Sequence, residues 1–248
     1  MGVPLGWSAN WSLRNRAGSQ TRWSGRANYQ SNKLGDYTCR VGASLSVRPS
    51  PSLQLSVQPD YRNEHGTRAT FSGPINRQYL TTLSGGRPEP FGNRYIFGFP
   101  DRTTLSMQMR VSYTFKPDLT LDVYAEPFAA SGRYVDFGET LAPGARELRL
   151  YGEDGMLIER VEDGSYIVTD GDDTFTLSNR DFNVRSFRSN VVLRWEWRPG
   201  STLFVVWQQN RESRVSDGQH VGLGDHFDSL TATGDNILAV KTTLWTSH

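Results

Sequence analysis

The stretch Arg194–Gln209, RWEWRPGSTLFVVWQQ, decides the fold. Tryptophan and aliphatic residues alternate with arginine and glutamate on both sides of the turn Pro199–Ser201. A period of two places successive side chains on opposite faces of a β-strand. The stretch therefore predicts a β-hairpin with one apolar, aromatic face and one charged face.

Two other segments repeat this pattern. Arg40–Tyr61, RVGASLSVRPSPSLQLSVQPDY, and Leu105–Glu126, LSMQMRVSYTFKPDLTLDVYAE, also carry a basic residue and a proline before a short polar turn. A turn of three residues would pair apolar with apolar side chains across each hairpin, as cross-strand packing requires. The expected opposing pairs are Val47 with Leu53, Phe115 with Leu119, and Trp197 with Leu203.

Strand length and loop length together indicate the fold class. GWSANWSL and RWSGRANYQ near the start and NILAVKTTLW near the end add strands, which gives about nine main strands of roughly 10–14 residues, against a usual roughly 5–6. The connections 63–93, 135–185 and 213–235 are longer than is common in compact domains. Short turns that alternate with long loops are typical of outer-membrane barrels. We expect an all-β, antiparallel up-and-down transmembrane β-barrel with its long loops on one side.

The parity of the strands bears on the organisation of the chain. Bacterial single-chain barrels have an even number of strands, and the sequence does not open with a basic segment followed by an apolar one. We therefore expect residues 1–248 to be the C-terminal part of a larger barrel. Within it, 135–185 is expected to be a long external loop with a small inserted β-meander, because it contains Asp-Gly turns at Gly155, Gly164 and Gly171.

Composition excludes several classes of protein. The net charge is +1, from 27 basic and 26 acidic residues, so nothing suggests a nucleic-acid partner. No apolar run reaches 18 residues, which excludes a helical membrane span. The single cysteine, Cys39, cannot form a disulfide within the chain.

The two faces of the hairpins predict two sets of residues. Aromatic rings that lie just before a short turn on the apolar face suit a girdle at the membrane–water interface. We expect this girdle to contain Tyr113, Phe115, Trp195 and Trp197. Charges of both signs on the opposite face suit a wet lumen. The expected lumen-facing charges are Arg110, Asp122, Arg188, Arg194 and Glu196.

Three patterns that could carry chemistry are better explained without it. The run 170–181 resembles a calcium loop, but Phe175 and Asp181 stand where that loop needs Gly and Glu. The run 220–228 holds residues of metal-ligand type without a second cluster; these are His220, Asp225, His226 and Asp228. Carboxylates that could pair for glycoside hydrolysis lie in no motif; these are Asp122, Glu126, Asp136 and Glu139. We expect no metal, no cofactor and no enzymatic activity.

Three stretches carry a resemblance to a known family. Asp101–Tyr134, Arg180–Arg211 and Gly234–Trp245 resemble a family of bacterial surface proteins without an established activity. Its members typically carry a family-9-type carbohydrate-binding-like module before a C-terminal outer-membrane β-barrel. The resemblance implies a bacterial outer-membrane location, with lipid as partner and carbohydrate bound only through the module, which is absent here.

Two functions follow as expectations. The first is a pore or transport role, or surface anchoring, by a segment of an outer-membrane barrel. The alternative is a soluble, secreted β-sandwich that binds carbohydrate through exposed aromatic residues. Strand length distinguishes them, because sandwich strands would stop after roughly 5–6 residues.

Overall fold

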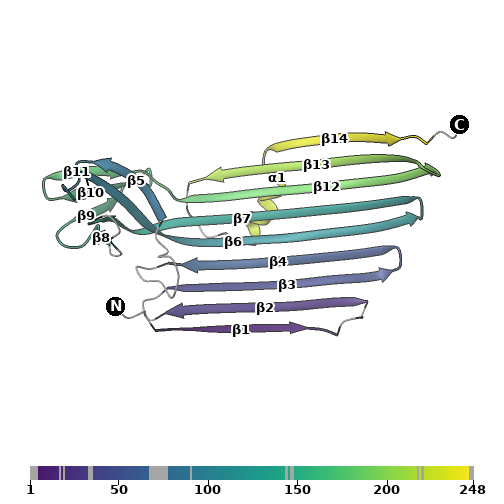
Figure 1. Ribbon diagram of the computed structural model, residues 1–248, viewed down its shortest axis with the longest axis horizontal. Helices are drawn as coiled ribbons and strands as arrows, with labels where there is room; N and C mark the ends of the chain where they lie inside the picture. Colours follow the sequence, from purple (N-terminus) through teal and green to yellow (C-terminus); the bar gives the residue numbers. More distant parts are fainter. Residues whose placement is uncertain are drawn as a thin grey trace.

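The chain folds into one long antiparallel sheet with a smaller sheet at one end (Figure 1). The computed structural model describes residues 5–16, 18, 20–32, 36–66, 78–89, 91–142, 145, 148–216, 218 and 221–245, without the side chains of Leu223 and His226. The long sheet has 11 strands. Its main path consists of β1 (Gly6–Arg14), β2 (Thr21–Asn32), β3 (Tyr37–Ser50), β4 (Leu53–His65), β6 (Asn93–Lys116), β7 (Leu119–Thr140), β12 (Phe182–Arg198), β13 (Ser201–Val215) and β14 (Gly234–Thr243).

Strands that follow each other along this path are antiparallel neighbours. The order is β1-β2-β3-β4-β6-β7-β12-β13-β14, while β5 (Gln78–Ser84) pairs with β6 and β8 (Leu148–Leu150) pairs with β7. Short turns gather at one end of the long strands and the longer connections at the other (Figure 1). The all-β class and the large antiparallel sheet are thereby confirmed, and the path consists of the strands expected from the alternation. In the part of the chain that the structure describes, β1 and β14 form the two edges of the sheet.

The hairpin register differs from the expectation in two of three cases. In β3–β4, Val47 pairs with Leu55, and in β12–β13, Trp195 pairs with Leu203. Both expected registers were therefore wrong by two residues, because the hairpin is centred one residue later than expected in β3–β4 and one residue earlier in β12–β13. The ladder of β6–β7 is the expected one, although its own bulge places Lys116 opposite Leu119. A slip of two residues keeps every side chain on its face.

The connection between β7 and β12 is shorter than 135–185. β7 continues to Thr140 and β12 begins at Phe182, because both ends remain paired in the ladder. Between them, β9 (Leu157–Arg160), β10 (Tyr166–Asp170) and β11 (Asp173–Leu177) form a separate sheet in the order β11-β10-β9. The glycines of the three Asp-Gly turns have positive φ values of 81°, 81° and 64°, which glycine adopts without steric cost.

The largest buried cluster joins this small sheet to the end of the β6–β7 hairpin. Its buried members are Ile96, Tyr134, Phe137, Tyr151, Met156, Val168 and Leu177. The hairpin and the small sheet therefore share one core, which lies at the loop end of the long sheet.

The connection 213–235 is not wholly a loop. It contains the helix α1 (Leu223–Thr231), which crosses the strands on one face of the long sheet (Figure 1). Tertiary contacts favour this helix, because Asp225 and Asp228 both reach Arg185 of β12. In the described residues, no helix is both long and apolar enough to cross a membrane.

Candidate functional site: the two faces of the long sheet

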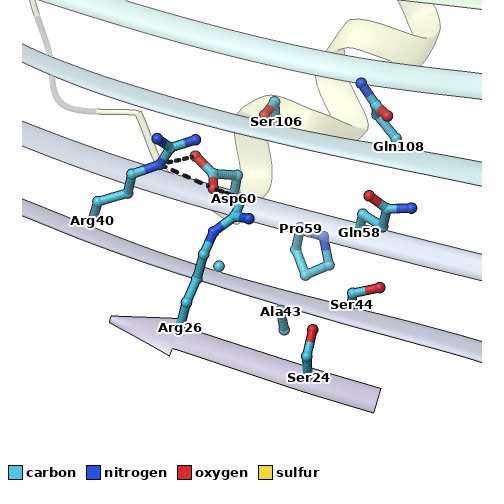
Figure 2. A pocket seen from close by; sticks show the side chains of 11 residues that line it. Ser24, Arg26, Arg40, Ala43, Ser44, Gln58, Pro59, Asp60, Ser106 and Gln108 are labelled. Atoms are coloured by element: carbon cyan, nitrogen blue, oxygen red, sulfur yellow. Dashed lines mark hydrogen bonds and ion pairs between the residues drawn. The ribbon is translucent and has the colours of Figure 1, made fainter. Parts of the chain in front are cut away.

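One face of the long sheet is polar and hollowed. It presents the even-numbered side chains of β1 to β4, β6, β7, β12 and β13, since these strands pair in register across the sheet. Residues of β2, β3, β4 and β6 line a hollow of about 220 Å³ on this face (Figure 2). Serine, glutamine, arginine and aspartate side chains dominate its wall. Such a surface suits water and polar solutes.

A carboxylate held by two guanidinium groups lies at one side of this hollow (Figure 2). Nη2 of Arg26 donates to Oδ2 of Asp60 at 2.8 Å, and Nε of Arg40 donates to Oδ1 at 3.0 Å. The three side chains come from three neighbouring strands. Gly42 leaves the space for them, because a Cβ there would lie 2.8 Å from Oδ2 of Asp60. The bridge therefore ties the strands together and leaves excess positive charge on the face.

A wider hollow of about 900 Å³ continues toward the turn end of the strands. Arg14, Arg22 and Arg110 line it, and no carboxylate does so among the described residues. Guanidinium groups bind carboxylate and phosphate oxygens with paired hydrogen bonds. This part of the face can attract anionic groups.

The structure places all five predicted lumen charges on the polar face, but in different surroundings. Arg194 donates to Glu196 at 3.1 Å, and Arg110 stacks 5.3 Å from the ring centre of Tyr124. Arg188 lies opposite Glu126 in the ladder, one row from the pair Asn190–Tyr124. Asp122 lies between Ser112 and Val192. The five residues thus form no single cluster, and sequence reasoning missed the Arg26–Asp60–Arg40 bridge because its members are far apart along the chain.

The opposite face is apolar and exposed. The predicted girdle residues form two edge-to-face pairs, Tyr113 with Phe115 at 4.5 Å and Trp195 with Trp197 at 6.3 Å between ring centres. Both pairs lie at the turn ends of their hairpins. Large side chains elsewhere on this face are also exposed; examples are Trp7, Trp11, Trp23, Val41, Leu45, Trp207 and Leu238.

Sequence reasoning missed a second row of aromatic rings at the opposite ends of the strands. Trp7, Tyr29, Tyr37 and His65 lie side by side on β1 to β4, with successive ring centres 5.1, 6.3 and 5.5 Å apart. The signal in the sequence was an aromatic residue near the loop end of each strand. It could not be used because the register between the hairpins was unknown.

The apolar side chains form a band that crosses the strands obliquely. One row of paired residues follows the ladder from β13 to β2; it consists of Gln209, Ser189, Ala125, Met109, Val57, Leu45 and Trp23. In β13 this row lies just beyond the apolar run Leu203–Trp207, toward the loops. In β2 it lies at the start of the run Trp23–Tyr29, toward the turns. The band therefore shifts along the strands from one side of the sheet to the other.

A buried ion network fastens the small sheet to the β6–β7 hairpin. Arg94 and Glu139 are each 4 % exposed. Arg94 bonds to Glu139 at 3.1 Å and to Asp170 at 2.9 Å, while Arg149 binds both carboxylate oxygens of Asp170, at 2.7 and 2.6 Å. The hydrogen bonds from Arg149 lower the pKa of Asp170 to about 2, against the effect of its burial. Each charged side chain has an oppositely charged partner, so we interpret the network as a structural clamp.

The residues of metal-ligand type have other partners. Asp225 and Asp228 bind Arg185, at 2.6 and 3.2 Å. Asp170, the first residue of the calcium-like run, is held by Arg149. His220 and the side chain of His226 lie outside the described residues. Among the described residues, no group of three or more histidine, cysteine or carboxylate side chains could hold a metal ion.

These observations define an all-β protein built on a long antiparallel sheet with one polar and one apolar face. The chain belongs to the DUF5916 family, a domain of unknown function, whose model matches residues 14–245. A comparison with curated proteins finds no match. Membership of a β-rich family of unknown function is thereby confirmed, whereas the carbohydrate module and the outer-membrane location stay predictions.

Proposed function

We propose that the long sheet is part of the wall of a bacterial outer-membrane β-barrel. The apolar face contacts lipid, the polar face lines the lumen, and the protein acts as a pore or as an anchor for a surface module. Five arginine and acidic positions, Arg110, Asp122, Arg188, Arg194 and Glu196, then lie in the lumen, and Tyr113 and Trp195 mark the interface at the turn side.

The oblique apolar band carries this proposal. Between the centres of the apolar runs in β13 and β2, the band shifts about seven residues, or ~23 Å at ~3.3 Å per residue. The two strands are separated by about six spacings of ~4.8 Å, or ~29 Å. A lipid layer that produced this shift would cross the strands at a tilt of about 40°, and barrel strands tilt by roughly 35–45°.

The length of the strands and the exposure of the apolar face favour the barrel over a soluble β-sandwich. The strands of the main path have 9 to 24 residues, several of them more than twice the usual roughly 5–6. In a sandwich, the apolar face of one sheet is covered by a second sheet. Here the apolar face carries exposed Trp11 and Trp23 along its length. In a soluble protein this exposed surface would lie in water, whereas a bilayer covers it.

The direction of the two edge strands determines how many further strands would close the barrel. β1 and β14 are the two ends of a path in which every step is antiparallel, and they run in the same direction (Figure 1). An antiparallel wall is closed by an odd number of further strands between them. The even total that results is the rule for bacterial single-chain barrels.

A cysteine scan of β6 tests the proposal. Single cysteines at Met107–Ser112, in a Cys39→Ser background, are labelled in isolated membranes with a water-soluble and a lipid-soluble maleimide. We expect the water-soluble reagent to label Gln108 and Arg110 positions and the lipid-soluble reagent to label Met107 and Met109 positions. Equal labelling of both faces by the water-soluble reagent, or recovery of the protein without detergent, contradicts the proposal.

A further inference from the structure

Helix α1 lies on the apolar face of the long sheet, not on the polar face. Val221, just before the helix, is buried against Leu105, Ala129 and Tyr61. These three residues are successive members of one row on the apolar face. The helix then crosses toward β12 and β13, so that its axis runs across the strands (Figure 1).

Polar contacts hold the inner side of the helix against this face. Arg185 projects from the apolar face of β12 and binds Asp225 at 2.6 Å and Asp228 at 3.2 Å. Arg211, on the same face of β13, donates to the carbonyl oxygen of Ala232 at 3.3 Å. The helix thus provides polar partners for two arginine side chains on the apolar face, Arg185 and Arg211.

The outer side of the helix is apolar. Phe227 is 70 % exposed and Leu230 is 40 % exposed. They are three residues apart, so they share one side of the helix. At about 100° per residue, that side is opposite Asp225 and the fully buried Ser229. The two apolar side chains therefore point away from the sheet.

The height of α1 on the sheet matches a membrane boundary. In β12, ten residues separate Trp195 of the turn-side aromatic pair from Arg185, which corresponds to ~33 Å of strand. At a tilt of about 40° this is ~25 Å along the membrane normal, which equals the usual height of the lipid-facing band of such barrels. Arg185 and α1 thus lie at the loop-side edge of the band.

We propose that α1 is an interfacial helix of the barrel wall that inserts Phe227 and Leu230 into the boundary between headgroups and acyl chains. Helices of this kind lie in the membrane plane with their apolar side in lipid, and the crossing direction of α1 gives that orientation. Its apolar side continues the lipid-facing surface of the sheet. The inference rests on the proposed barrel and names the lipid surface as the partner of α1.

Spin labels test the inference separately from the barrel. Single cysteines replace Met109, Asp163 or Phe227 in the complete barrel with Cys39→Ser, refolded into phosphatidylcholine vesicles. Collisions of the label with oxygen and with a water-soluble nickel complex report its depth. We expect the Met109 site to be lipid-like, the Asp163 site aqueous, and the Phe227 site at the boundary, with oxygen accessibility several-fold above that of Asp163.

The other possible results of the spin-label experiment distinguish a failure of the inference from a failure of the proposed barrel. A Phe227 site as aqueous as the Asp163 site, together with a lipid-like Met109 site, overturns the inference and leaves the barrel. Spin–spin broadening at the Phe227 site, with both collision rates low, overturns it in favour of a contact between two copies. An aqueous Met109 site overturns the proposed barrel itself.

A second variant separates insertion from folding. With the label at Leu230, Phe227→Asp should return the label to the aqueous value, while Phe227→Leu should keep it at the boundary. Equal depths in the two variants overturn the inference.

Discussion

Adjacent positions of β6 offer a matched test of the face assignment. Met109 lies between Val57 and Ala125 on the apolar face. Gln108 lines the polar hollow, and its Nε2 donates to Oε1 of Glu126 at 3.3 Å. Met109→Arg and Gln108→Arg place the same charge on opposite faces of one strand, starting from unbranched side chains of similar size. The two variants therefore add the same charge and a similar side-chain volume to the same strand.

The structure sets the size of the expected difference. Met109 lies four residues from Tyr113 of the turn-side aromatic pair, or ~13 Å along the strand. At a tilt of about 40° this is ~10 Å along the membrane normal, close to the middle of a band ~25 Å high. An arginine on the lipid face at the midplane destabilises a barrel by about 2–4 kcal/mol. The Gln108→Arg variant gains a carboxylate neighbour and should change stability by about 0.5 kcal/mol or less.

Reversible denaturation in lipid vesicles measures both values. We expect the midpoint of Met109→Arg to move to lower denaturant with an unchanged slope, and that of Gln108→Arg to stay near the parent protein. A loss of stability that is equal in both variants, or larger for Gln108→Arg, would refute the assignment of the odd-numbered face to lipid.

Three other predictions concern the hollow, a close contact and the clamp. Gly42→Leu should displace the bridge of Arg26, Arg40 and Asp60, because even a Cβ there would lie 2.8 Å from Oδ2 of Asp60, and its side chain should narrow the polar hollow, which the accessibility of a cysteine at Ser44 to water-soluble maleimide can measure. Gly132→Ala should destabilise the loop end of the sheet, because a Cβ there would lie 2.4 Å from the ring of Phe182, and hydrogen exchange of β12 should report the loss. The folded-state pKa of Asp170 is about 2, below the unfolded value of ~3.9, so its contribution to stability is present above about pH 4 and lost as the pH falls toward 2. Proteolysis of residues 148–177 should accelerate over that range, and Asp170→Asn should remove this dependence on pH.

The alternation of apolar and polar residues was enough to predict the strands of the main path and the face of each side chain. Those properties depend on the local sequence alone. The hairpin registers were harder, because a shift of the hairpin centre by one residue is invisible in the alternation. The partner of Trp195 differs from the expected one by two residues. Such a shift leaves every side chain on the same face, so the alternation cannot detect the error.

Features that depend on distant contacts could not be predicted. Helix α1 is short, and its position is set by Arg185, about forty residues earlier in the chain. The bridge of Arg26, Arg40 and Asp60 and the clamp around Arg94 join residues from separate strands. Charge content alone does not show which of the many arginine and carboxylate side chains meet.

Because the strands differ in length, β6 and β7 extend beyond the rest of the long sheet. From Leu105, at the edge of the apolar band, β6 continues twelve residues to Asn93, or ~40 Å of strand, and β7 accompanies it in the ladder. With the band in lipid, this ribbon would rise ~30 Å above the bilayer surface and carry the small sheet at its tip, stiffened by β5 and β8 on its flanks. If the proposed outer-membrane barrel has this end outside the cell, large particles would meet the projection before they met the rest of the wall.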